Sequence, residues 1–232
     1  MKIYALSDLH LSFQTDKPMN VFGEKWDGYE EKIKNNWNSM VTNDDVVIVA
    51  GDISWAMNIS ETKEDFKYIG ELSGTKILVR GNHDYWWKAI STVRDNLPEK
   101  TYALQNDAIK IQDKIFCGTR GWTVAERNCK LSDTDEKIYK RELIRLEMAL
   151  SRANELRTNN EEIIVVLHYP PFNSSLDTNE FTELIERGNA SKVVYGHLHG
   201  KTKYTSFNTE INGVKYFLSS CDKIHFEPIV IE

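Results

Sequence analysis

The stretch KILVRGNHD, residues 76–84, carries the pattern that decides the fold of this chain. Its first half is apolar and β-branched, which predicts a buried strand over 75–79. Its second half places an arginine, an amide, an imidazole and a carboxylate directly after that strand: Arg80, Asn82, His83 and Asp84. In α/β sheets ligands bind beyond the carboxyl ends of the strands, so this stretch predicts both a strand and a site.

The same pattern recurs along the chain. Further strands are predicted over 2–7, 46–50, 114–118, 163–167 and 192–195. Four of these are followed at once by side chains that can bind metal ions, namely Asp8 and His10, Asp52, His168, and His197 with His199. Five strand ends thus deliver carboxylates, an amide and imidazoles, and we expect them to meet at one rim. Of the six histidines only His225 falls outside this pattern.

Helical patterns separate the predicted strands, and the alternation of strands and helices predicts an α/β fold. They are predicted over 29–41, 61–72, 85–97 and 134–157. The longest should begin at a cap formed by Asp133 or Ser132, and its apolar stripe indicates core packing, with a partner-helix surface as the alternative. The chain then turns antiparallel, with strands at 204–210 and 214–219 joined by Asn212-Gly213 and a last strand at 224–231. We expect a single domain over residues 1–232.

Composition narrows the function further. The 232 residues are 41% hydrophobic and 28% charged, and no apolar run approaches the roughly 20 residues of a membrane span. The formal charge of −6 disfavours nucleic acid as a partner, because it repels polyanions. The amino-terminal segment lacks a secretory signal pattern. The three cysteines, Cys117, Cys129 and Cys221, are widely spaced, so we expect reduced thiols in the cytoplasm.

The side-chain types predict a metal centre. Asp8 and His10 are two residues apart, as are His197 and His199, and in an extended segment such pairs point to the same side. Oxygen and imidazole ligands without thiolate favour Mn, Fe, Zn, Co or Ni. The seven candidate ligands exceed the needs of one catalytic ion, which keeps an open position. Two divalent ions that share Asp52 account for the number.

These motifs together resemble the signature blocks of the calcineurin-like metallophosphoesterase superfamily, and within it small bacterial predicted phosphohydrolases. The resemblance covers residues 8–199 and implies two facing mixed β-sheets flanked by helices. It also implies two ligand sets that share one residue: Asp8, His10, Asp52 and His199 for one metal, and Asp52, Asn82, His168 and His197 for the other. The expected activity is phosphoester hydrolysis, in which a hydroxide between the metals attacks phosphorus.

Four residues are predicted to assist. His83 would stabilise the transition state or protonate the leaving group, as the resemblance implies. Asp84 would orient His83 by accepting its other N–H, or serve as a carboxylate at a helix start. Arg80 and Arg120 are candidates for binding the substrate phosphate, and for each the alternative is a structural ion pair.

The substrate is predicted to be small or nucleotide-like. The residues after Asp52 are Ile53-Ser54-Trp55-Ala56, which departs from the motif of Ser/Thr protein phosphatases and disfavours protein dephosphorylation. Tryptophans close to the motifs would either stack on a base or pack in the core: Trp55, Trp86, Trp87 and Trp122. Mixed charges on the 134–157 helix argue against a membrane surface. The alternatives are a nuclease of the same superfamily and a non-enzymatic scaffold with this fold.

Overall fold

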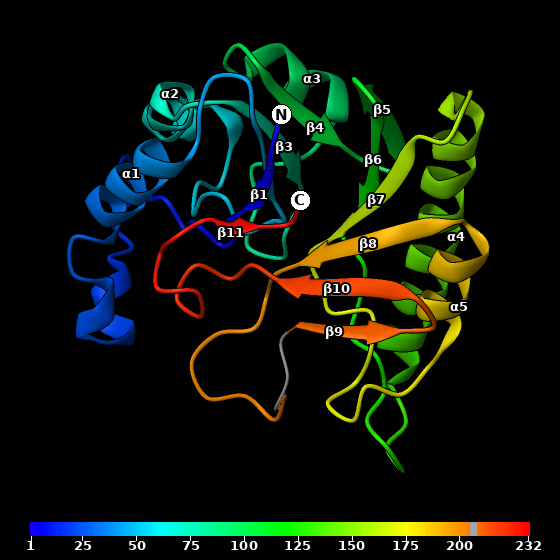
Figure 1. Ribbon diagram of the computed structural model, residues 1–232. Helices are drawn as coiled ribbons and strands as arrows, with labels where there is room; N and C mark the ends of the chain where they lie inside the picture. The colour runs from blue at the N-terminus through cyan, green and yellow to red at the C-terminus, as the bar shows by residue number, and fades with distance from the viewer. Residues whose placement is uncertain (205–207) are drawn as a thin grey trace. The chain divides into compact units, whose positions relative to one another are not determined.

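The computed structural model describes residues 1–204 and 208–232. Their contacts divide the chain into two compact units, the first made of Met1–Ala103 with Ser219–Glu232 and the second of Leu104–Leu218. Each unit holds its own mixed β-sheet with helices beside it (Figure 1). The predicted class, an α/β fold with two mixed sheets flanked by helices, is therefore confirmed, whereas the single domain over 1–232 stays a prediction.

The first unit is organised around a sheet in the order β11-β1-β2-β3-β4. Its strands are β1 (Ile3–Ala5), β2 (Val46–Val49), β3 (Thr75–Val79), β4 (Thr101–Leu104) and β11 (Ile229–Val230). The central three are parallel, with Ala5 opposite Ile48 and Ile48 opposite Ile77. Because parallel strands end at the same edge of a sheet, the residues that follow β1, β2 and β3 are brought together.

The helices of this unit follow from their apolar spacing. They are α1 (Tyr29–Met40), α2 (Lys63–Glu71), α3 (Ile90–Asn96) and the short 3₁₀ segments η1 (Met19–Phe22), η2 (Glu24–Trp26) and η3 (Ile59–Thr62). The prediction for 29–41 is confirmed, but the helix predicted to begin at Tyr85 begins at Ile90. The intervening residues form a turn, in which Trp87 N–H donates to the Asp84 carbonyl and the Trp86 indole donates to the Asp84 carboxylate.

The second unit carries a six-stranded sheet in the order β5-β6-β7-β8-β10-β9. Its strands are β5 (Asp107–Ile111), β6 (Lys114–Thr119), β7 (Glu162–Leu167), β8 (Ala190–Tyr195), β9 (Asn208–Ile211) and β10 (Val214–Leu218). The long helix α4 (Asp133–Leu156) packs on β5 and β6, and α5 (Glu180–Arg187) packs on β8 and α4 (Figure 1). Strands β6, β7 and β8 are parallel, so their carboxyl ends also share one edge.

Local signals explain most of the second unit. Ser132 caps α4, since its Oγ accepts from the N–H of Asp135, and the apolar stripe of α4 is buried in the core. The Asn212-Gly213 turn joins β9 to β10 with both residues at positive φ, 51° and 83°, as a tight hairpin requires. Residues 205–207 of the strand predicted at 204–210 lie outside the described residues.

Some elements differ from the sequence-based expectation. The strand predicted over 224–231 is wrong in extent, because only Ile229 and Val230 pair with β1 while the preceding residues form turns. Strands β4 and β5 and helix α5 were not predicted from the sequence. Helix α5 is capped by Asn179, whose side chain accepts from Phe181 N–H while Thr182 Oγ1 accepts from Asn179 N–H.

Two general expectations can be checked on the described residues. None of the helices there combines the length and hydropathy of a membrane span. Cys117, Cys129 and Cys221 are free thiols, as the sequence predicts.

The buried Lys76 gives the first unit a testable dependence on pH. Its Nζ donates to the carbonyls of Leu72 and Gly74, at 2.9 and 3.1 Å, and burial lowers its pKa to about 8 from 10.5. Between these values the unfolded chain binds the proton that Lys76 has lost in the folded chain, so the contribution of Lys76 to the free energy of unfolding rises with pH. We expect this contribution to rise by up to about 3 kcal/mol from pH 8 to 10.5, while the buried thiols of Cys117 and Cys221, whose pKa burial raises, act in the opposite direction.

Urea unfolding of wild type and Lys76→Met across this pH range measures the contribution, which is the growth with pH of the difference between their free energies of unfolding. The exposed Lys67→Met serves as the control, and its difference from the wild type should stay constant with pH. A pH profile that Lys76→Met leaves unchanged would contradict the assignment.

Candidate metal centre

In the first unit the segments after β1 and β2 run side by side and hold three candidate ligands. Asp8 N–H donates to the Gly51 carbonyl at 3.0 Å, and His10 N–H donates to the Asp52 carbonyl at 2.9 Å. The backbone is left-handed at Asp8, His10 and Asp52, with φ of 59°, 46° and 50°. The segment is therefore not extended as predicted, but the expectation that Asp8 and His10 point to the same side is confirmed, since their ligand atoms lie within 4.8 Å of one another. Left-handed non-glycine residues are uncommon, and they concentrate at functional loops.

The Asp52 carboxylate lies where the three strand ends meet. Its Oδ2 is 3.8 Å from His10 Nε2, and its Oδ1 accepts the backbone N–H of His83 at 2.8 Å. Gly81 makes this approach possible, because a Cβ there would lie 2.1 Å from Asp52 Oδ1. Asn82 follows Gly81 in the same loop. The first unit thus gathers the candidate residues from β1, β2 and β3, as predicted.

Asp84 has a different role from the predicted one. Its Oδ1 accepts from the N–H groups of Ile53 and Ser54 and from the Trp86 indole, and its Oδ2 accepts from Gly81 N–H at 2.7 Å. Within the described residues none of its hydrogen bonds goes to the His83 ring, and the helix α3 begins too far along for Asp84 to cap it. Through these hydrogen bonds Asp84 connects the loop after β2 with the loop after β3. Burial and the charge of Asp52 raise the pKa of Asp84 to about 6.

Asp84→Asn should loosen both loops. One carboxylate oxygen becomes an NH₂ group, so a donor faces one of the N–H groups that the carboxylate now accepts. We expect the free energy of unfolding of metal-free protein to fall by about 1–3 kcal/mol, with metal affinity about 10–100-fold weaker. Urea unfolding in chelator and metal titration measure the two effects. The exposed Asp95→Asn is the control. If both variants have the same free energy of unfolding and the same metal affinity, Asp84 does not hold the two loops together.

A layer of small buried side chains supports the Asp8 loop. Ser7 Oγ lies 2.6 Å from Ser219 Oγ and accepts the N–H of Ala50, while Cys221 Sγ donates to the Asp8 carbonyl at 3.0 Å. Burial raises the pKa of the Cys221 thiol, which makes it a structural group. Ser7 and Ser219 were not predicted from the sequence. The sequence indicates them only by position, since Ser7 directly precedes Asp8 and Ser219 directly follows β10.

Aromatic rings surround His10 and His83 in the first unit. The Trp55 ring stacks on His10 with centroids 4.9 Å apart and lies 4.4 Å from the His83 ring. Trp86 and Trp87 are fully buried in the core, so the idea that they stack on a base is wrong. Trp26 also contacts His10 edge-on, at 6.3 Å, and was not singled out from the sequence.

The second unit brings its own candidate ligands together. His168 Nε2 lies 3.2 Å from His197 Nδ1, and the Tyr169 ring packs on His197 at 4.1 Å. The N–H of His168 donates to the Arg120 carbonyl at 3.0 Å, which sets the end of β7 beside that of β6. His197 is left-handed, with φ of 71°, and His199 follows in the same loop after β8.

The two candidate phosphate-binding arginines differ in their surroundings. Arg120 Nη2 lies 3.7 Å from the buried Glu142 carboxylate, and the guanidinium stacks on Trp122 at 4.5 Å. This is the structural ion pair considered as the alternative, although Arg120 still adjoins His168. Arg80 follows β3, and among the described polar atoms its Nε is buried with no hydrogen-bond partner. Arg80 therefore keeps donor capacity for a ligand.

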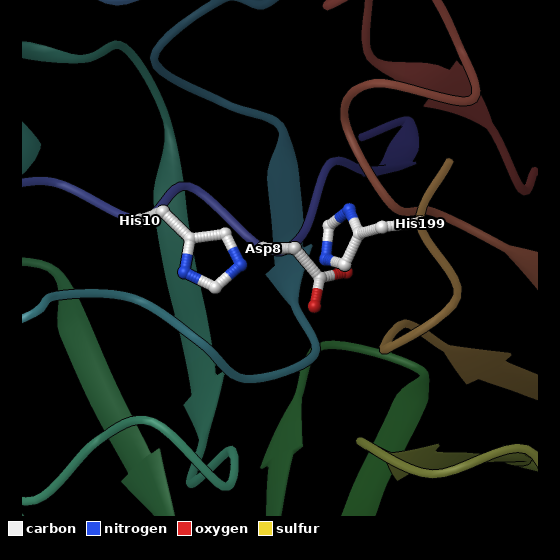
Figure 2. A group of neighbouring side chains, drawn as sticks. All are labelled: Asp8, His10 and His199. Atoms are coloured by element: carbon white, nitrogen blue, oxygen red, sulfur yellow. The ribbon is translucent and has the colours of Figure 1, made fainter. Parts of the chain in front are cut away.

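The donor sets of both units fit divalent metal ions. Each candidate aspartate offers a carboxylate oxygen and each histidine a ring nitrogen, as Figure 2 draws for Asp8, His10 and His199. Asp8, Asp52 and His168 are buried, and a buried carboxylate needs a cation or several donors to remain charged. Oxygen and imidazole donors without thiolate suit hard or borderline ions.

The comparison with protein families agrees with this chemistry. A family model described as calcineurin-like phosphoesterase matches residues 1–201. The chain belongs to this family. Members of the calcineurin-like phosphoesterase family usually bind divalent metal ions, in agreement with the donor sets found in both units.

Solved structures of the same fold come from several bacteria. AQ665 from Aquifex aeolicus, a protein of unknown function, has a TM-score of 0.54 at 17% identity, with 99% of this chain and 95% of that one covered. Phosphopantetheinyl hydrolase from Mycobacterium tuberculosis has a TM-score of 0.54 at 16% identity, covering 93% and 87%. TT1561 of Thermus thermophilus has a TM-score of 0.54 at 13% identity, covering 98% and 96%. These likenesses show the fold.

One relative is similar in sequence. The uncharacterized protein MJ1445 of Methanocaldococcus jannaschii is 27% identical over 117 residues, which are 46% of this chain. The match spans 64% of that relative's length, somewhat under two thirds.

Proposed function

We propose that this calcineurin-like phosphoesterase is a dinuclear metal-dependent hydrolase of phosphodiesters or phosphomonoesters, acting on a small or nucleotide-type substrate. Asp8, His10, Asp52 and His199 would hold one ion, and Asp52, Asn82, His168 and His197 the other. Mn, Fe, Zn, Co and Ni all suit these donors. When bound, the two ions would supply Lewis acidity and lower the pKa of a water molecule, the nucleophile of the reaction.

The protein's own groups would do the rest. Arg80 would bind a phosphate oxygen through its guanidinium, whose Nε is buried and has no partner in the described part of the chain. His83 would protonate the leaving group, because its backbone is anchored on Asp52 and its ring lies in the same cluster as His10. Arg120 would contribute positive charge beside His168.

The observation that carries the proposal is the convergence on Asp52. Groups from three strand ends meet there, namely the Asp52 carboxylate, the His10 ring and the backbone N–H of His83. Both His10 and Asp52 have left-handed backbone. Such strain persists only where the surrounding structure enforces it, and it is typical of active sites. The formal charge of −6 supports a small substrate over nucleic acid or a membrane surface, and the free thiols agree with a cytoplasmic location.

The test is hydrolysis of bis-p-nitrophenyl phosphate and of its monoester, with metal-stripped protein reloaded with each of the five metals. Metal-dependent turnover of either ester is expected, and preference for one assigns diesterase or monoesterase activity. Cleavage of DNA or RNA oligonucleotides at a comparable rate would favour the nuclease alternative. Absence of turnover together with failure to retain metal would favour the scaffold alternative and refute the proposal.

A further inference from the structure

A small apolar pocket adjoins the His10 side of the candidate centre. It has a volume of about 270 Å³ and is lined by Lys17, Pro18, Met19, Val21, Phe22 and Trp55; we call it the Trp55 pocket. All six residues belong to the first unit. Trp55 links the pocket to the centre, since its ring also stacks on His10 and packs beside His83. Only the Trp55 ring would separate a group in this pocket from His10, a proposed metal ligand.

The pocket is built on an anchored segment. The Trp55 indole N–H donates to Met19 Sδ at 3.2 Å, and Met19 is buried, which holds η1 against the ring. The next apolar residues of η1 face solvent: Val21 is 71% exposed and Phe22 is 64% exposed. Single exposed apolar residues are ordinary, but a neighbouring pair that lines a hollow beside an active site is typical of ligand binding.

The charge at the pocket restricts its occupant. Lys17 Nζ lies 4.9 Å from the centroid of the Trp55 ring, so a cation already occupies the position that a cationic ligand would seek. A neutral apolar group gains from contact with Val21, Phe22 and Trp55, whereas a quaternary ammonium of the same shape would be repelled by Lys17.

We propose that the Trp55 pocket receives a neutral apolar group esterified to the phosphate of the substrate. The proposal rests on the proposed function and narrows it, from any small phosphoester to one with an alkyl or aryl substituent. It makes Val21, Phe22 and Lys17 specificity-determining residues.

The test compares three alkyl phosphates as competitive inhibitors of bis-p-nitrophenyl phosphate hydrolysis: methyl phosphate, 3,3-dimethylbutyl phosphate and choline phosphate. The last two have the same shape and differ by one positive charge. We expect the dimethylbutyl compound to bind at least about tenfold more tightly than methyl phosphate, since methylene contacts in an apolar pocket discriminate by such factors. Choline phosphate should bind about tenfold or more weakly than its neutral counterpart.

Variants assign these differences to the pocket. Val21→Ser with Phe22→Ser should reduce the ratio between dimethylbutyl and methyl phosphate to near one, and Lys17→Ala should narrow the gap between dimethylbutyl and choline phosphate. Ile144→Ser is the matched control, because Ile144 is 59% exposed on α4 and serine and isoleucine have similar helix propensity. The control should keep both ratios.

A second measurement separates the pocket from the activity. In protein loaded with diamagnetic Zn²⁺ and labelled with ¹⁵N-tryptophan, 3,3-dimethylbutyl phosphate should shift the Trp55 indole N–H resonance, assigned with Trp55→Phe. Active enzyme with equal inhibition by methyl and dimethylbutyl phosphate would overturn the pocket and leave the proposed function standing. If no phosphoester is turned over, the proposed function fails, and an unshifted Trp55 resonance would then overturn the pocket as well.

Discussion

Replacing Asp52 with alanine is expected to lower kcat/KM for phosphoester hydrolysis by at least about 10³-fold. Asp52 is the ligand proposed to be shared by both ions, and its carboxylate also positions His83 through the backbone N–H. Its loss removes a negative charge from both ligand sets and the anchor of the general acid. Steady-state kinetics on bis-p-nitrophenyl phosphate and metal content by elemental analysis measure the two consequences.

Asp52→Asn separates charge from shape. The asparagine keeps an oxygen for the N–H of His83, but it is a far weaker metal ligand. In metal-free protein the melting temperature of this variant should equal or exceed that of the wild type. In the wild type the negative charge of Asp52 opposes ionisation of the buried Asp84, and the substitution removes this repulsion. The rise in melting temperature on addition of Mn²⁺ should disappear.

The control lies at the opposite end of the same strand. Asp44 is exposed in the turn before β2, whereas Asp52 follows β2, so Asp44→Ala should retain metal content and activity. If Asp52→Asn keeps activity within tenfold of the wild type, Asp52 is not a shared ligand and the dinuclear proposal fails.

Gly81→Ala is expected to be the second most damaging change. The added methyl group would lie 2.1 Å from Asp52 Oδ1 and 2.2 Å from Asp52 N, and neither atom can yield without moving the loop after β2. Overpacking of this kind costs about 1–3 kcal/mol or more, and a displacement near 1 Å at a catalytic group costs about 100-fold in rate. We expect about 3 kcal/mol less free energy of unfolding and at least about 100-fold lower kcat/KM.

A second glycine distinguishes close approach from backbone conformation. Gly28 has φ of 60°, which alanine adopts reluctantly, but a Cβ there would meet nothing within 4 Å. Gly28→Ala should therefore cost about 1 kcal/mol and spare the activity. If Gly28→Ala is the more harmful of the two substitutions in urea unfolding and kinetics, the contact between Gly81 and Asp52 is not what the loop requires.

The positions of the candidate ligands could be predicted from the sequence. Asp8, Asp52 and Asn82 each follow a short apolar, β-branched run, and a run of that kind can be recognised locally. Because parallel strands end at a common edge, the order strand then polar residue already predicts that these side chains gather. The same local logic identified α1, the Ser132 cap and the Asn212-Gly213 turn.

The roles of individual groups needed the tertiary structure. Asp84 could not be distinguished from a partner of His83, because two of its actual partners, Ile53 and Ser54, lie 31 and 30 residues away in sequence. The pairing of Ser7 with Ser219 spans 212 residues and leaves no local signal. The Trp55 pocket likewise arises from η1 folding back on a residue after β2.

The chain's sequence by itself determined the family, the α/β class and the set of candidate metal-binding side chains, since each depends on residue type and short-range spacing. The tertiary structure decided which backbone is left-handed, which carboxylate binds backbone N–H groups rather than an imidazole, and where an apolar pocket adjoins the centre. The physical reason is that these properties depend on burial and on contacts between distant segments. Such contacts form only when the sheet has brought the strand ends together.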